Sequence, residues 1–220
     1  MSRTGGTQLA ATRTAGFLLF ACSAIFLAAM AACIAMAPFL LEDNNLSEFG
    51  IHPPTALIFN GALVLVGTMT VVAAWCFGGR QAWLVAGLLV VAGAGMVGAG
   101  VVTVEIDRMA HAIFAGIDYA GHLLLTLIIA RTLVGGLRAA GHIAVTLSIV
   151  LLLLWVFQAP FLFDTIRQAG AQLLTTLPLV AWMVAYSSRL IRSRAARDPR
   201  LRIPAALRRF WLKARLTNAG

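Results

Sequence analysis

Six long apolar runs, separated by short polar links, are the feature that most constrains how this chain can fold. A transmembrane helix needs about 20 predominantly apolar residues to cross the hydrocarbon core of a bilayer. Backbone polar groups find no water there, so a spanning segment of this kind satisfies them internally as a helix. The runs cover residues 15–39, 55–78, 82–104, 111–130, 139–160 and 170–187. The sequence therefore predicts an all-α polytopic membrane protein with six transmembrane helices.

Composition supports the same class and limits the number of domains. The chain is 60% hydrophobic and 11% charged, whereas a soluble domain has about 45–50% apolar and about 25% charged residues. No polar stretch is long enough to form a separate soluble domain. The predicted organisation is a cytoplasmic N-terminus at 1–14, a six-helix transmembrane bundle at 15–187 and a basic cytoplasmic tail at 188–220.

The distribution of positive charge predicts the orientation of the bundle. With both termini in the cytoplasm, 15 of the 17 Lys and Arg residues lie inside, and Arg108 and Arg167 lie outside. Such an excess on the cytoplasmic side is what the positive-inside rule describes. The predicted location is the plasma (inner) membrane of a bacterium or archaeon, with both termini cytoplasmic.

The third apolar run contains the sequence "AGAGMVGAG", in which small residues recur at four-residue spacing. Helices in lipid associate through close backbone approach, which small side chains permit. The run therefore predicts a close-packing face that includes Ala94, Gly95, Gly98 and Ala99. Pro178 in the sixth run predicts a local break in the hydrogen-bond ladder of its helix.

The fourth run carries four titratable side chains, Asp107, His111, Asp118 and His122. At 100° per residue they fall within one narrow stripe, if the helix already includes Asp107. Ionisable groups in a bilayer normally face the bundle interior. The spacing predicts two i,i+4 pairs, Asp107 with His111 and, deeper in the membrane, Asp118 with His122. The two histidines lie about 16 Å apart along the axis, too far for one zinc ion, and no metal or cofactor is predicted.

Three interpretations of these two pairs remain open, the first two of which concern the deeper pair. In the first, Asp118 and His122 form a structural polar seam that hydrogen-bonds Asn60 of the second helix or Gln158 of the fifth. In the second, the pair belongs to a proton or ion path. The cytoplasmic half of the helix reads "LLLTLIIA", where Thr126 is the only polar side chain, and this argues against a route through the membrane. In the third, a zinc at the outer pair recruits Glu48 or His52.

The first outward link reads "NNLSEFGIHPPTALIFNGALVLVG" over residues 44–67. Its Leu-Ser-Glu-Phe-Gly segment, followed by an Asn-containing second span, resembles the membrane family catalogued as domain of unknown function 998. The resemblance covers residues 15–187 and implies a six-span bundle, without an established reaction. The segment "EIDRMAH" stands where the family has an acidic or His-bearing start of the fourth span, but the Phe-Pro usual before it is missing. A more distant similarity is to eukaryotic six-span proteins of autophagy and GPI-anchor lipid remodelling.

The same link predicts a polar pocket at the outer membrane surface. Ser47, Glu48 and His52 are expected to lie over the outer end of the fourth helix, beside Asp107 and His111. Such a pocket suits a lipid headgroup, and a Ser/His/acid set also suggests a hydrolase. The G-x-S-x-G turn of one large hydrolase class is absent from the sequence.

The C-terminal tail predicts an amphipathic helix on the membrane surface. Residues 189–220 contain ten basic residues and one acid. A basic helix with aromatic residues on its other face binds an anionic cytoplasmic leaflet or a partner subunit, and nucleic acid is a weaker interpretation. The docking residues predicted are Arg208, Arg209, Phe210, Trp211, Lys213 and Arg215.

The leading functional hypothesis is therefore a non-catalytic accessory or lipid-interacting subunit of a membrane assembly, with membrane lipids and other membrane subunits as partners. The first alternative is a lipid-headgroup-modifying enzyme with its pocket at the outer surface. The second is a proton- or ion-coupled carrier that uses Asp118 and His122.

Overall fold

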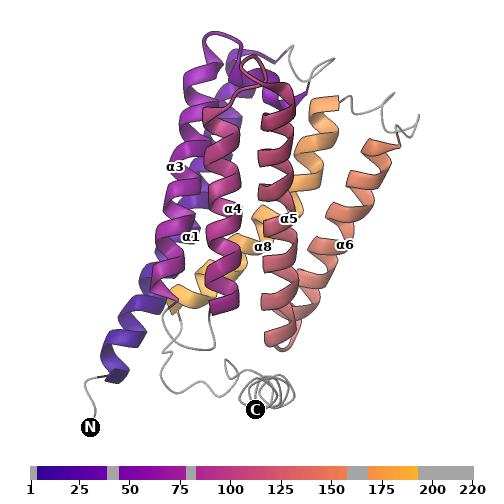
Figure 1. Ribbon diagram of the computed structural model, residues 1–220. Coiled ribbons are helices and arrows are strands. Elements are labelled where there is room, and N and C mark those ends of the chain that lie inside the picture. Colours follow the sequence, from indigo (N-terminus) through magenta and orange to yellow (C-terminus); the bar gives the residue numbers. More distant parts are fainter. Residues whose placement is uncertain (1–3, 39–44, 78–82, 158–167, 193–220) are drawn as a thin grey trace, which may run out of the picture.

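Over the residues that the structure describes, the protein is a bundle of six long helices with one short 3-10 helix, η1, and all of the secondary structure there is helical (Figure 1). The computed structural model describes residues 4–38, 45–77, 83–157 and 168–192. The elements are α1 (Thr4–Met36), η1 (Leu46–Gly50), α3 (Thr55–Cys76), α4 (Trp83–Val101), α5 (Arg108–Thr132), α6 (Gly136–Val156) and α8 (Gln168–Arg192).

The six long helices are each long and apolar enough to cross a membrane, which confirms the predicted fold class. Large apolar side chains cover the outside of the bundle, as a lipid-facing surface requires. Leu57 and Trp75 on α3 are 84% and 85% exposed, and Phe157 after α6 is 76% exposed. Trp75 and Trp83 lie near helix ends, where indole rings favour the membrane–water interface.

Two helices begin earlier than the apolar runs suggest. The helix α5 begins at Arg108, because the Asp107 side chain accepts hydrogen bonds from the backbone N–H groups of Met109 and Ala110 and so caps its first turn. The helix α1 begins at Thr4, in an Ala-rich polar segment that the prediction placed before the first span.

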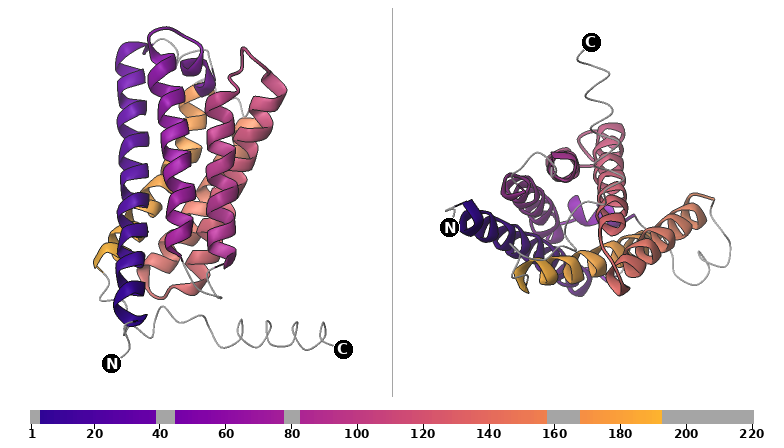
Figure 2. Two further views of the ribbon diagram at one scale, coloured as in Figure 1. Left: turned by 60° about the vertical axis from the view of Figure 1, so that its left-hand side comes forward. Right: turned by 90° about the horizontal axis from the view of Figure 1, so that it is seen from below.

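The long helices form a ring, in which neighbours pack in the order α1, α3, α4, α5, α6, α8 and back to α1 (Figure 2). The end where α1 begins and α8 finishes is called the terminal end, and the opposite end, which carries η1, is called the distal end. Among the described residues, five arginines lie toward the terminal end and Arg108 lies at the distal end. That the terminal end faces the cytoplasm stays a prediction.

The helix α4 packs closely against α3 through glycine. A Cβ atom placed on Gly67 or on Gly93 would lie 2.6 Å from the carbonyl oxygen of the other glycine. Neither position therefore accepts a side chain without separating the two helices.

The other side of α4 packs closely against α5 in the same way. A Cβ on Gly95 would lie 2.6 Å from the backbone nitrogen of Asp118, and one on Gly98 would overlap the ring of Phe114. The close-packing prediction for the third span is thus confirmed for Gly95 and Gly98. It is wrong for Ala94, which is exposed on the outside of the bundle.

The terminal half of the bundle has a filled core. Three side chains here are 2% exposed or less: Leu125 and Ile129 of α5, and Leu133, which directly follows α5. They pack with Trp182 and Tyr186 of α8. The Trp182 and Tyr186 rings are stacked with centroids 5.3 Å apart. The Trp182 indole donates a hydrogen bond to the Leu137 carbonyl at 3.1 Å, which ties α8 to α6.

The glycine contact between α3 and α4 yields a test with a matched control. Gly93→Ala forces the two backbones apart and is expected to cost about 1–3 kcal/mol, the usual range for overpacking. Gly87→Ala on the same helix meets no atom within 4 Å and is expected to be neutral or slightly stabilising. Denaturant unfolding in detergent micelles measures both. Equal stability of the two variants would contradict the proposed contact.

Candidate functional site

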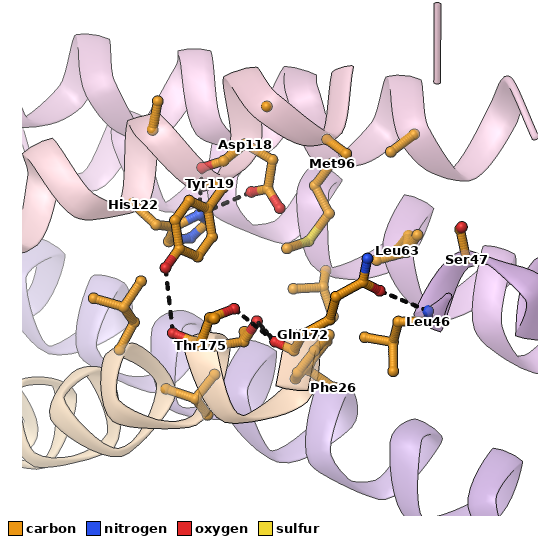
Figure 3. A pocket seen from close by; sticks show the side chains of 18 of the residues that line it. Phe26, Leu46, Ser47, Leu63, Met96, Asp118, Tyr119, His122, Gln172 and Thr175 are labelled. Carbon is orange, nitrogen blue, oxygen red and sulfur yellow. Dashed lines mark hydrogen bonds and ion pairs between the residues drawn. The ribbon is translucent and has the colours of Figure 1, made fainter. Parts of the chain in front are cut away.

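The distal half of the bundle contains a cavity of about 770 Å³, called the central cavity, bounded by all six long helices, with α6 contributing Leu152, and by η1 (Figure 3). Its wall is mostly apolar and includes Phe26, Leu63 and Met96, with a small number of polar groups. Both its size, within about 300–1,000 Å³, and this kind of lining are typical of small-molecule sites. The cavity is therefore the candidate functional site.

The central cavity has an open side along α5. Ala112, Gly116 and Ala120 are spaced four residues apart, line the cavity and are nevertheless exposed. In Figures 1 and 2 the distal ends of α5 and α6 lie apart, while their terminal ends lie close together. This side of the cavity is therefore formed by small residues that do not close it off from the outside of the bundle.

At the distal end, an amide side chain joins η1 to α8. The Leu46 backbone N–H donates to the Gln172 side-chain oxygen at 2.6 Å, and the Gln172 amide nitrogen donates to the Asn45 side-chain oxygen at 3.1 Å. Figure 3 shows Gln172 extending from α8 toward Leu46. These bonds hold η1 over the cavity, and Ser47 and Glu48 of η1 line it there with Arg108 of α5.

The Leu-Ser-Glu-Phe-Gly segment is locked onto α3. Phe49 is fully buried, and the Thr55 hydroxyl donates to its carbonyl at 2.8 Å. The Asn60 amide donates to the Gly50 carbonyl at 2.7 Å, and a Cβ on Gly50 would lie 2.6 Å from the Asn60 side-chain oxygen. Gly50 is thus required by the close approach of Asn60. The polar seam was predicted to reach Asn60 or Gln158; the Asn60 amide serves the loop instead, and Gln158 lies outside the described residues.

The deeper pair of the α5 stripe forms as its spacing predicts. His122 Nδ1 lies 2.8 Å from Asp118 Oδ1 and 3.1 Å from the Asp118 carbonyl oxygen. The ring N–H is directed at the carbonyl, so the carboxylate lies close to the ring without a well-aligned hydrogen bond. Both side chains line the central cavity, about 15 Å along α5 from Arg108.

The outer pair of the stripe does not form. The Asp107 carboxylate is occupied as the N-cap of α5, and it lies outside the set of cavity-lining residues. His111 is buried and its Nδ1 lies 2.8 Å from the Val102 carbonyl oxygen, which ties α5 to the end of α4. His111 still lines the cavity, so three of the four stripe residues share it.

Tyr119 joins three helices beside the cavity. Its hydroxyl lies 3.0 Å from the Ser148 carbonyl oxygen of α6 and 3.4 Å from the Thr175 carbonyl oxygen of α8, and it donates to these acceptors. Thr175 lies in the turn before Pro178, the proline inside α8. Tyr119 therefore links α5 to the α6–α8 side of the ring.

The remaining predicted residues are not gathered at one place. His52 lies in the loop before α3 and does not line the central cavity. Gln158 and the tail residues Arg208 to Arg215 lie outside the described residues. Within the described ranges, no three His, Cys, Asp or Glu side chains converge as metal ligands.

Four cavity residues that the sequence reasoning passed over are Arg108, Tyr119, Gln172 and Thr175. Gln172 carried a signal, since an amide in an apolar run marks an interhelical hydrogen bond as clearly as Asn60 does. Tyr119 carried none, because its partners on α6 and α8 are distant in sequence.

The fold and the cavity together define a six-span helical membrane protein with a distal, largely apolar interior site. Residues 20–189 match the family model described as protein of unknown function DUF998. This match covers well over half of the chain, and the protein belongs to that family. No curated protein and no solved structure matches the chain, so the distant similarity to autophagy and GPI-remodelling proteins stays a prediction.

Removal of one hydroxyl tests the link that Tyr119 makes. Tyr119→Phe loses its bonds to α6 and α8 and is expected to lower the free energy of unfolding by about 0.5–1.5 kcal/mol. Tyr186→Phe is the matched control, because within the described part of the chain its hydroxyl makes no hydrogen bond. Denaturant titration in micelles compares the two variants. An equal loss in both would show that Tyr119 does not join the helices.

Proposed function

We propose that this membrane protein holds one lipid-like amphiphile in the central cavity and acts as a non-catalytic, lipid-interacting component of a membrane assembly. The observation that carries the proposal is the cavity itself, about 770 Å³ of mostly apolar interior inside a membrane-spanning bundle. An apolar void of this size would forfeit packing contacts if it stayed empty. A hydrocarbon chain fills such a space and restores them.

The open side along α5 supports a ligand that arrives from lipid. Gly116 and its neighbours at four-residue spacing leave room between the cavity and the outside of the bundle. An amphiphile can pass through this side without leaving the hydrocarbon layer. Part of its chain can also remain outside the bundle, so the cavity volume does not limit the length of the ligand.

The geometry favours binding over catalysis. A nucleophilic serine needs a base within hydrogen-bond reach. Within the described part of the chain, no hydrogen bond joins Ser47 to His111, whose Nδ1 is occupied by the Val102 carbonyl. Asp107 is equally occupied as a helix cap. Two of the five outer residues considered for catalysis, Asp107 and His111, thus have structural roles.

The filled terminal half favours a binding protein over a carrier. Leu125, Ile129 and Leu133 close the space beneath the cavity together with α8. Between residues 123 and 130 of α5, Thr126 is the one polar side chain, and it is 1% exposed. A carrier would need a second polar route toward the terminal end. The role within an assembly rests on the charge of the predicted basic tail.

A cavity-filling substitution tests the proposed ligand. Gly116 lines the cavity and a Cβ there meets no atom within 4 Å, so Gly116→Phe can occupy the site without a backbone clash. Gly61→Phe is the matched control, since Gly61 is equally open but lies outside the cavity. Native mass spectrometry after gentle extraction is expected to show one bound molecule on wild type and Gly61→Phe, and at least a tenfold lower occupancy on Gly116→Phe.

Two results would contradict the proposal. One is a wild-type protein that carries no defined small molecule in any gentle extraction. The other is equal occupancy in Gly116→Phe and Gly61→Phe, which would place the bound molecule on the outer surface. Thermal stability of both variants, measured in the same micelles, controls for misfolding.

A further inference from the structure

We infer that the ligand of the central cavity is a cationic amphiphile that binds head-first, with a protonated amine held by Asp118 at the floor of the cavity. The inference rests on the proposed function and adds the chemical class and the orientation of the ligand. It follows from the polar groups deep in the cavity, which offer a ligand hydrogen-bond acceptors and few donors, unlike the groups at the distal end.

Asp118 is short of a hydrogen-bond donor. Its Oδ1 is buried and, among the described residues, receives no well-aligned hydrogen bond, although His122 Nδ1 lies 2.8 Å away. That N–H points to the Asp118 carbonyl oxygen. A carboxylate deep in a membrane is costly unless donors or a positive charge compensate it. Asp118 therefore retains the capacity to bind a charged donor.

The hydroxyl groups at the same depth have already donated their protons to the backbone. Thr70 donates to the Val66 carbonyl at 2.8 Å, Ser23 to the Leu19 carbonyl at 3.1 Å and Thr175 to the Gln172 carbonyl at 2.6 Å. Tyr119 donates to the carbonyls of α6 and α8. All four side chains line the cavity, and they offer a ligand only their oxygen lone pairs.

His122 adds a further acceptor. Its Nδ1 faces two oxygens of Asp118 and therefore carries a ring hydrogen, so that in the neutral form of the ring Nε2 is an acceptor. The floor of the cavity is thus rich in acceptors and poor in donors. An ammonium group has three donors and no acceptor. An alcohol has one donor, and a carboxylate only adds acceptors.

The orientation follows from what each end of the cavity needs. Glu48 and Arg108 at the distal end are close to the polar loops, where water can satisfy them. A lipid with its headgroup there would place methylene groups against Asp118, which would bury the carboxylate without a partner. With the amine at Asp118, the chain lies along Phe26, Leu63 and Met96 and leaves through the open side.

A chain-matched series tests this inference on the protein in lipid nanodiscs. Cys22 lines the central cavity, whereas Cys76 lies outside it and is partly exposed, so alkylation of Cys22 relative to Cys76 by a membrane-permeant maleimide reports cavity occupancy. Dodecylamine, dodecanol and dodecanoate are added at equal mole fractions. Dodecylamine is expected to protect Cys22 at about one tenth of the mole fraction that dodecanol needs, the ratio that a charge-assisted hydrogen bond supplies.

Variants assign the preference to Asp118. Asp118→Asn is nearly isosteric with the wild-type side chain. In this variant dodecylamine is expected to protect Cys22 only at about the mole fraction that dodecanol needs, while protection by dodecanol persists. Glu105→Gln removes the same charge from an exposed distal loop and is expected to leave the preference unchanged. The comparison of the three probes on wild type needs no variant, so it stands even if Asp118→Asn fails to fold.

The outcomes separate this inference from the proposed function. Equal protection by all three probes, or an amine preference that survives in Asp118→Asn, would overturn the amine site and leave an amphiphile in the cavity. No protection by any probe, together with no co-purified molecule, would overturn both. An amine-bearing lipid on the protein from its own membrane identifies the membrane as the source. Amine selectivity without such a lipid identifies an amphiphile taken up from outside.

Discussion

The close approach of α4 to both of its neighbours is the constraint on which the rest of the structure depends. Gly67 and Gly93 bring α3 and α4 into backbone contact, and Gly95 brings α4 onto α5 at Asp118. Three helices therefore form one tight wall. On the other side of the ring α5 packs only loosely against α6 and α8, and Tyr119 joins it to both of them at mid-depth. The cavity occupies the space that this difference leaves.

The same wall explains why an ionisable pair persists deep in the bundle. Gly95 fixes the backbone of α5 at Asp118, so the carboxylate and His122 face the cavity and not lipid. The side-chain hydroxyls around them donate to backbone carbonyls, which lowers the free-energy cost of burying each hydroxyl. These hydroxyls therefore provide no donor for the carboxylate. A bound amine supplies those donors, so in this account the packing of the helices and the chemistry of the site are coupled.

What the sequence could predict depended on the distance along the chain between interacting residues. Apolar run length predicts six spans, and i,i+4 spacing predicts the Asp118–His122 contact, because both are local. The outer pair was mispredicted although Asp107 stands just before a helix, a position typical of an N-cap. Asn60 was assigned to the wrong partner, and Gln172 to none, since their contacts with η1 depend on how distant segments come together.

The most direct test of this account is an experimental density map of wild-type protein in nanodiscs made from its own lipids. The account predicts one elongated, continuous density in the central cavity, which runs beside Phe26 and Met96 and ends within hydrogen-bond distance of Asp118. Separate spherical densities at the polar groups, or closure of α6 and α8 onto α5 with no remaining space, would contradict it. The first would show a hydrated cavity, and the second would show that the bundle holds no ligand.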